Sequence, residues 1–157
     1  MFSRARHHCR PVGIGEPIPQ LCAYLSFDGT CADAMRFYER TIGGRLEALL
    51  RFAATPAAGA VPEASRNRIM HAYLVLPDSS ALMAGDAPPG QPFEPMRGLS
   101  MTLACPTVTE SRRVFEALAD GGRVQMPMGP TFWAAQFGMV TDRFGTPWII
   151  NGEPRPV

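Results

Sequence analysis

The sequence predicts an α+β fold in which two βαβββ modules form curved mixed sheets around a cavity. The first observation is an internal repeat: Thr30-Cys-Ala-Asp33 and Thr107-Val-Thr-Glu110 each place a hydroxyl residue three positions before a carboxylate, as helix N-termini often do. The second is an apolar, strand-like run before each copy, from Leu21 to Phe27 and from Leu99 to Cys105. Two copies of one strand–helix–strand unit predict two sheets that lie against each other with a concave site between them.

The repeat continues along both helical stretches and past their ends. A Gly-Gly-Arg sequence follows each of them, at 43–45 and at 121–123, and glycine is common just after the last residue of a helix. Other residues recur at one constant offset: Arg36, Tyr38 and Glu39 in the first copy correspond to Arg113, Phe115 and Glu116 in the second.

Turn residues and hydrophobic periodicity divide the first half into elements. The first strand is followed by Asp28-Gly29, a typical turn sequence. Beyond it, Ala34, Phe37, Tyr38 and Thr41 fall on one helix face at three- and four-residue spacing. The segment 53–68 is rich in Ala, Pro, Gly and Ser without periodicity, so we expect a mobile loop that covers the pocket. Strands are expected at Leu21–Phe27, Arg45–Phe52, Ile69–Leu76 and Ala81–Ala84, the last two as a hairpin.

The second half repeats this order after a proline-rich linker at 86–98. Asp142, which precedes Arg143-Phe-Gly145, is expected to accept hydrogen bonds from backbone amides of its own turn. The expected elements are strands at Leu99–Cys105, Arg123–Met126, Ala134–Val140 and Pro147–Asn151 and a helix at Val108–Ala119. The predicted organisation is a flexible N-terminal arm at 1–19, a first module at 20–85, the linker, and a second module at 99–152.

Composition narrows the classes of partner. The 157 residues, of which 46% are apolar and 18% charged, suit one compact domain or two tightly joined halves. The net charge is +1 and no Lys/Arg block stands out, which argues against a nucleic-acid partner. No apolar run approaches the roughly 18 residues that span a bilayer, so we expect no membrane partner. The N-terminal residues lack the apolar stretch of a secretory signal, and we expect a cytoplasmic protein.

The cysteines show no CxxC pair, which disfavours a zinc site and a disulfide framework. Most of them lie in apolar surroundings. Buried free thiols in a reducing compartment are therefore expected for the four cysteines Cys9, Cys22, Cys31 and Cys105.

A series of short motifs runs from about Gln20 to Asn151. They are Asp28-Gly29, Ala34-Met-Arg-Phe-Tyr38, Gly43-Gly44, Met70-His71-Ala72, Asp86-Ala-Pro-Pro89, Thr131-Phe-Trp133, Phe137-Gly-Met-Val-Thr-Asp142, Arg143-Phe-Gly145 and Pro147-Trp148. With these motifs the chain resembles the PhnB-like branch of the vicinal oxygen chelate superfamily, which includes glyoxalase I, extradiol dioxygenases and bleomycin-resistance proteins. The resemblance implies the glyoxalase/bleomycin resistance fold, with a pocket between paired βαβββ modules, and a homodimer.

The resemblance also carries expectations about chemistry. Members of this branch are often labelled as demethylubiquinone methyltransferase-like, but the sequence offers no glycine-rich nucleotide loop for S-adenosylmethionine, and we discount that activity. In metal-dependent relatives, ligands come from inward-facing positions on four strands. Those positions fall here on Cys22 (or Gln20 in a shifted register), His71, Ser100 and Ile149. A divalent site needs three or four converging donors, so we expect neither a metal nor a cofactor.

His71 shares one strand face with Tyr73, and it coincides with a ligand position of the relatives. It could bind a ligand or act as a general base, or it could be a buried histidine satisfied by a neighbouring hydroxyl. Tyr24 shares a face with Cys22, and Thr102 shares one with Ser100. If these faces point inward, their hydroxyls suit an organic ligand with a few polar atoms; ordinary half-buried sheet packing is the alternative.

An aromatic cluster near residue 133 completes the candidate site. Thr131, Trp133 and Gln136 are expected at the pocket rim, where aromatic faces stack on a ligand, although core or dimer-interface packing also explains such a cluster. The resulting hypothesis is a protein that binds a small organic ligand as a homodimer. The alternatives are a metal-dependent lyase, isomerase or dioxygenase that uses His71, and a structural partner in a larger assembly.

Overall fold

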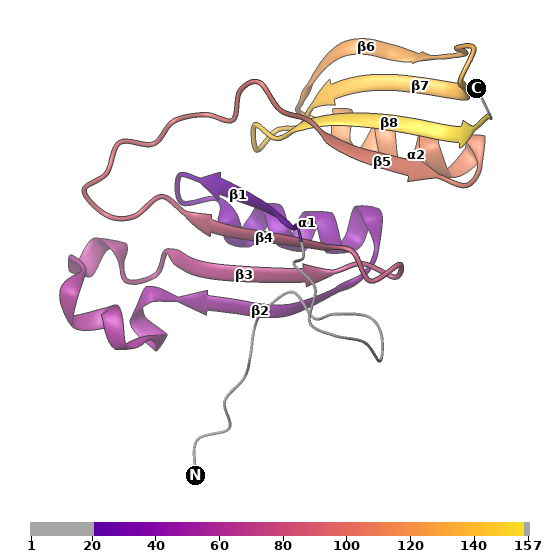
Figure 1. Cartoon of the computed structure of the whole chain (residues 1–157). Helices are drawn as coiled ribbons and strands as arrows, with labels where there is room; N and C mark the ends of the chain where they lie inside the picture. Colours follow the sequence, from indigo (N-terminus) through magenta and orange to yellow (C-terminus); the bar gives the residue numbers. More distant parts are fainter. Residues whose placement is uncertain (1–20, 156–157) are drawn as a thin grey trace. The chain divides into compact units, whose positions relative to one another are not determined.

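The computed structural model of the chain describes residues 21–155, and Figure 1 shows their arrangement. The predicted flexible arm at 1–19 lies outside the described residues. The chain divides into two compact units, with the boundary between Phe93 and Glu94. No helix among the described residues combines the length and the apolar character needed to cross a membrane.

The first unit contains one βαβββ module. Its sheet has the strand order β1-β4-β3-β2, in which β1 runs parallel to β4 and the other neighbours are antiparallel. The elements are β1 (Ala23–Phe27), α1 (Cys31–Ile42), β2 (Arg45–Arg51), three short 3₁₀ turns η1 (Phe52–Ala54), η2 (Pro56–Ala60) and η3 (Glu63–Ser65), β3 (Ile69–Val75) and β4 (Ala81–Asp86).

The second unit repeats this topology. Its order is β5-β8-β7-β6, again with the first strand parallel to the last and the other pairs antiparallel. The elements are β5 (Met101–Cys105), α2 (Val108–Ala119), β6 (Arg123–Gly129), β7 (Ala134–Thr141) and β8 (Pro147–Pro154). Two four-stranded mixed sheets with one helix each confirm the predicted α+β class and the two βαβββ modules.

Helix α1 lies against one face of the first sheet (Figure 1). The four residues predicted to share a helix face, Ala34, Phe37, Tyr38 and Thr41, are all buried, which confirms the periodicity. They pack over apolar side chains of the strands such as Leu25, which is 2% exposed. Burying each large side chain contributes about 1.5–3 kcal/mol, so this interface stabilises the unit.

The two helices begin differently, although the sequence predicts the same capping box for both. At α2, the Thr107 hydroxyl accepts a hydrogen bond from the Glu110 amide (3.1 Å), as expected. At α1, the Thr30 side chain caps no amide, so the prediction is wrong there. The carboxylate of Asp86 takes that place and accepts a hydrogen bond from the Cys31 amide.

The predicted turn at Asp142 is confirmed. Its buried carboxylate accepts hydrogen bonds from the amides of Phe144 (2.8 Å) and Thr146 (3.1 Å), and also from the indole Nε1 of Trp148 (2.8 Å). The hairpin at 77–80 is also present: the Leu76 amide donates to the Ser80 carbonyl.

Two expectations need correction. The segment 53–68 is not irregular throughout, because prolines at 56 and 62 favour tight turns and the chain forms η2 and η3 there. Cys22 is disulfide-bonded rather than free, whereas Cys31 and Cys105 are buried free thiols as predicted. Cys22 lies partly exposed just before the edge strand β1. Cys9 lies outside the described residues.

Candidate functional site

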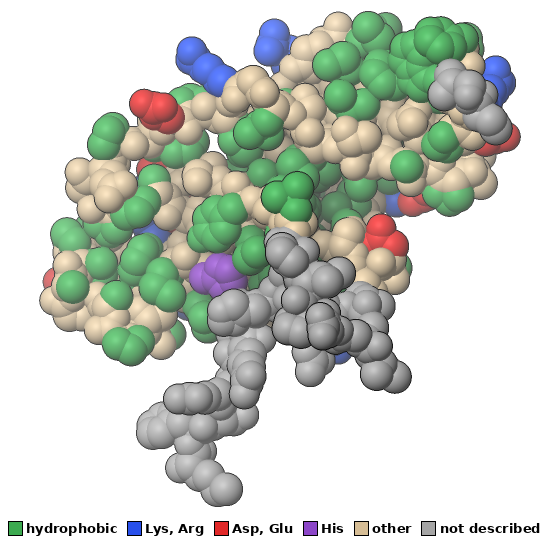
Figure 2. Space-filling view, viewed as in Figure 1, with side chains coloured by type: hydrophobic (Ala, Val, Ile, Leu, Met, Phe, Trp, Pro, Cys, Tyr) green, Lys and Arg blue, Asp and Glu red, His purple; other side chains and the backbone are tan. Residues whose placement is uncertain are grey.

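The candidate site of the first unit is the sheet face opposite α1, which we call the open face. Strand pairing places Tyr24 beside Met83 and Met83 beside Tyr73, so these three side chains project to one side, and His71 joins them by alternation along β3. Figure 2 shows hydrophobic side chains gathered on the first unit, with a histidine among them. The structure therefore brings together three of the predicted residues: Tyr24, His71 and Tyr73.

The rings of Tyr24 and His71 stack on each other across two strands. Their centroids are 6.1 Å apart and their planes differ by 24°. The Tyr24 hydroxyl lies 3.4 Å from the Met70 carbonyl oxygen, to which it donates a hydrogen bond. The stacking and the hydrogen bond thus both fix the position of the phenol ring, although the Tyr24 residue is about half exposed.

Gly85 makes this arrangement possible. It lies on β4, between the strands of Tyr24 and His71, and a Cβ at this position would be 2.6 Å from the Tyr24 hydroxyl oxygen. The missing side chain lets the phenol lie across β4 and reach the backbone of β3. A residue with a side chain here would displace the aromatic pair.

The Tyr24 phenol is kept neutral at physiological pH. Burial raises its pKa above the ordinary 10.0, and the nearby Cys31 and Asp86 raise it further because a second negative charge is unfavourable beside them. Tyr24 therefore remains a hydrogen-bond donor.

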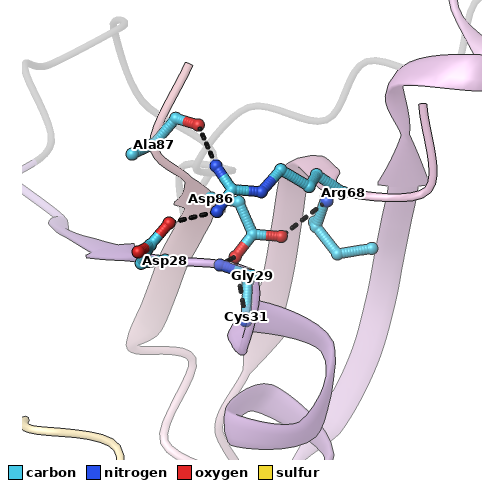
Figure 3. A network of polar contacts seen from close by, with 7 residues as sticks. Asp28, Gly29, Cys31, Arg68, Asp86 and Ala87 are labelled. Carbon is cyan, nitrogen blue, oxygen red and sulfur yellow. Dashed lines mark hydrogen bonds and ion pairs between the residues drawn. The ribbon is translucent and has the colours of Figure 1, made fainter. Parts of the chain in front are cut away.

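A buried carboxylate holds the strands of the aromatic pair in register. Asp86 is 6% exposed and accepts three backbone hydrogen bonds, from Gly29 (2.8 Å), Cys31 (3.1 Å) and Ile69 (2.7 Å) (Figure 3). These amides belong to the turn after β1, the first residue of α1 and the first residue of β3. Asp86 therefore ties the end of Tyr24's strand to the start of His71's strand.

Arg68 extends this network toward the surface. Its guanidinium donates to the Ala87 carbonyl (3.2 Å) and forms an ion pair with Asp28 (Figure 3). The role of Asp86 was not predicted, because the sequence interpretation placed this residue in the linker. The available signal is a carboxylate at the end of the apolar strand that begins at Ala81.

The second unit has a corresponding open face that carries an aromatic cluster. Trp133 contacts Phe132 (ring centroids 4.6 Å apart) and Phe137 (5.3 Å), both edge to face. On β8, Asn151 pairs with Phe137 of β7, and Ile149, two residues earlier, pairs with Thr102 of β5. Thr102 therefore lies on the same face as Phe137 and the aromatic cluster.

Two of the remaining predicted residues of this unit, Gln136 and Thr131, do not join that face. Gln136 pairs with Gly152 and points to the α2 side, where an added Gly152 side chain would meet Ser111. Thr131 closes the β6–β7 hairpin, with its hydroxyl accepting from the Ala134 amide (3.1 Å). Ser100 is exposed just before β5.

Asn151 is a polar residue that the sequence interpretation assigned no role. It lies on the open face beside Phe137, and its side-chain oxygen is buried without a hydrogen-bond partner among residues 21–155. A buried acceptor of this kind normally finds a partner, so Asn151 is a candidate contact for a polar ligand atom. Its sequence signal is weak, an asparagine at the end of an apolar strand.

The positions that correspond to metal ligands in relatives supply few donors. His71 offers an imidazole and Ser100 a hydroxyl, but Ile149 has no donor atom and the Cys22 sulfur is held in a disulfide. Gln20, the alternative to Cys22, lies outside the described residues. Within the described part of the chain, no three His, Cys, Asp or Glu side chains gather closely enough to hold a metal ion. This donor set does not fit a divalent cation, which needs three or four ligands.

Comparison with known proteins places the chain in a family. The family model described as 3-demethylubiquinone-9 3-methyltransferase matches residues 19–151. Protein YjdN of Escherichia coli is 36% identical over 139 residues, which cover 83% of this chain and 93% of YjdN.

Solved structures share the fold of the chain. Protein PA1353 from Pseudomonas aeruginosa is 48% identical, with a TM-score of 0.80 over 87% of this chain and 98% of PA1353. A PhnB protein from Bacillus cereus (24% identity, TM-score 0.71, 85% and 98% coverage) shares the fold. So does a glyoxylase/bleomycin resistance protein/dioxygenase domain from Frankia sp. EAN1pec (13%, TM-score 0.61, 89% and 100% coverage). The chain therefore belongs to the 3-demethylubiquinone-9 3-methyltransferase family, and it has the glyoxalase/bleomycin resistance fold.

Proposed function

We propose that this protein binds a small organic molecule on the open face of its first unit, without the superfamily's metal ion. The observation that carries the proposal is the stacked pair of Tyr24 and His71. A hydrogen bond to the Met70 carbonyl fixes the Tyr24 ring, and Gly85 leaves room for it because it has no side chain. An aromatic surface that is fixed before binding loses little conformational entropy when a ligand arrives.

The surroundings of the pair indicate the class of ligand. Tyr73 and Met83 lie beside it on the same face, and a flexible thioether adapts to ligands of different shape. Polar groups are few: the hydroxyl groups of Tyr24 and Tyr73 and the imidazole of His71. This combination favours a planar, mainly apolar molecule with one or two hydrogen-bonding atoms.

The donor set supports binding rather than metal-dependent catalysis. His71 is the single strong donor among the four positions that correspond to metal ligands in relatives, and we derive no reaction step through a metal. The family description names a methyl transfer, so S-adenosylmethionine belongs among the probes, although the sequence offers no glycine-rich loop for it.

Native mass spectrometry of freshly purified full-length protein tests the proposal. We expect a co-purified small molecule on the wild type, and its loss from His71→Ala and Tyr24→Leu. Phe132→Leu is the matched control, because Phe132 is 78% exposed and lies in the second unit. A ligand retained by both open-face variants would contradict the proposal.

Elemental analysis separates binding from the enzyme alternative. Stoichiometric Zn, Ni, Mn or Fe on protein purified without chelator, lost in His71→Ala, would favour a metal-dependent lyase, isomerase or dioxygenase. Turnover of the co-purified molecule, or methylation in the presence of S-adenosylmethionine, would likewise replace a pure binding role.

The proposal includes a homodimer and a cytoplasmic location. Light scattering of the purified protein measures the first, and a lone dimer with an occupied pocket would argue against a role in a larger assembly. Cell fractionation measures the second. Recovery in an extracytoplasmic fraction would contradict the proposed location and would agree with the disulfide at Cys22, because structural disulfides are rare in reducing compartments.

A further inference from the structure

We propose that the first unit carries a second binding site, for a small organic anion, in a groove on the helix-covered side of its sheet. The groove has a volume of about 460 Å³. Its lining residues come from α1, β2, η1 and the segment before β3: Arg36, Leu49, Arg51, Ala53, Ala54 and Asn67.

The groove is separate from the aromatic pair. Leu49 pairs with Ala72, which pairs with Ala84. Ala72 and Ala84 are fully buried, so this row of the sheet faces α1. Tyr24 and Tyr73 belong to the alternate row, on the open face. A ligand in the groove therefore contacts neither residue, and the inference does not depend on the proposed function.

Within residues 21–155, the two guanidinium groups of the groove have no acidic partner. The ion pairs among these residues use other arginines, and neither Arg36 nor Arg51 forms an ion pair or a side-chain hydrogen bond with another described residue. Two arginines that line one groove without neutralising carboxylates produce a positive potential there, which attracts anions.

The internal repeat shows that this is not a general property of the helix position. Arg113, the counterpart of Arg36 in α2, is held by two hydrogen bonds to the Glu110 carboxylate (2.9 and 2.6 Å). The first unit has the shorter Asp33 at the position of Glu110, and Asp33 forms no ion pair with Arg36. The first unit thus leaves its arginine available to a ligand where the second unit engages it.

The groove walls are fixed by backbone hydrogen bonds. The Phe52 amide donates to the Arg68 carbonyl (3.0 Å), and the Ala53 amide donates to the Arg66 carbonyl (2.9 Å). These bonds attach η1 to the segment that contains Asn67, so both walls keep their separation. A volume of 460 Å³ lies within the roughly 300–1,000 Å³ of small-molecule sites.

The lining indicates the ligand's chemistry. Guanidinium groups bind carboxylate or phosphate through paired hydrogen bonds, and the amide of Asn67 adds one donor and one acceptor. Leu49, Ala53 and Ala54 offer an apolar surface for the remainder of the molecule. The expected ligand is a carboxylate or phosphate joined to a short apolar group.

Calorimetric titration of the full chain tests this site with three probes that share one butyl group and offer no flat ring to the aromatic pair. Pentanoate and butyl phosphate carry the two candidate anions, and 1-butanol is the neutral analogue. We expect one or both anions to bind and the alcohol not to bind. The stronger anion distinguishes a carboxylate site from a phosphate site.

Charge-removing variants identify the groove as the location. Arg36→Gln and Arg51→Gln should each weaken anion binding by about tenfold, the value of one charge-assisted hydrogen bond at a partly exposed site. Arg40→Gln is the matched control, because Arg40 is an exposed arginine of the same helix that does not line the groove. His71→Ala should leave anion binding unchanged. Equal affinities in all variants, equal weakening by Arg40→Gln, or no anion binding at millimolar concentration would overturn the inference.

Discussion

The change Asp86→Asn tests whether one buried carboxylate holds the first unit together. Asp86 accepts backbone hydrogen bonds from Gly29 and Cys31 on one oxygen and from Ile69 on the other. Asparagine has nearly the same shape, so it creates no cavity. Its amide oxygen can keep the first two bonds, but its NH₂ group would face the Ile69 amide, donor against donor.

The cost follows from this geometry. A hydrogen bond to a charged group contributes about 1.5–3 kcal/mol, and the Ile69 amide would remain buried without a partner. The bonds to Gly29 and Cys31 would also weaken, because the acceptor becomes neutral. We therefore expect the free energy of unfolding to fall by about 2–4 kcal/mol, and the midpoint of thermal unfolding to fall by roughly 5–15 °C.

Thermal and denaturant unfolding measure the total loss, and native-state hydrogen exchange of the Ile69 amide locates it. Asp78→Asn is the control: Asp78 is an exposed turn residue whose carboxylate accepts only from Ser80 (2.9 and 2.6 Å). Its substitution should cost less than about 1 kcal/mol. If both variants lose the same stability and Ile69 exchanges at the wild-type rate, Asp86 does not join these strands as argued.

Three further predictions follow from local contacts. Thr107→Ala should lower the free energy of unfolding by about 1 kcal/mol, because the Thr107 hydroxyl caps α2. Thr30→Ala should lower it by much less, because the Thr30 side chain caps no amide. Equal losses of stability in thermal unfolding would show that the two caps do not differ. Burial and then Asp86 raise the pKa of the Cys31 thiol from 9.0 to about 12, so the folded protein keeps a proton that the unfolded chain releases. The corresponding stability is complete below pH 9 and is lost as pH rises toward 12; Cys31→Ala should flatten that part of the profile, and parallel wild-type and variant profiles would refute it. Gly85→Ala places a Cβ 2.6 Å from the Tyr24 hydroxyl oxygen, so it should lower the free energy of unfolding by about 1–3 kcal/mol and move the Tyr24 ring away from His71. The NMR chemical shifts of the His71 imidazole should then change, and unchanged shifts would contradict this prediction.

Features that depend on neighbouring residues could be predicted from the sequence. The buried helix face at Ala34 and Tyr38 follows from three- and four-residue periodicity, and the turn at Asp142 from a short polar side chain near its own backbone. The cap at Thr107 belongs to the same class. Each of these contacts joins residues within a few positions of each other.

Features that join distant residues could not be predicted. Asp86 replaces the Thr30 cap because the fold brings β4 beside the start of α1, which no local pattern indicates. Gln136 was predicted at the pocket rim with Trp133. Successive side chains of a strand point to opposite faces, so the register of β7, and not closeness in sequence, determines on which face Gln136 lies. The disulfide of Cys22 likewise depends on spatial proximity.

The parallel pairing of first and last strands has a consequence for how each unit assembles. In the first unit, β2, β3 and β4 pair with strands adjacent in sequence, whereas Ala23 must find Leu82. Closing the longer loop carries the larger entropic penalty, so the hairpins should form early and β1 should add last. Pulse-labelled hydrogen exchange during refolding should then protect β3 amides before those of β1. If β1 adds last, the stacking of Tyr24 on His71 forms in the final step, and a chain in which β1 is not yet paired lacks it.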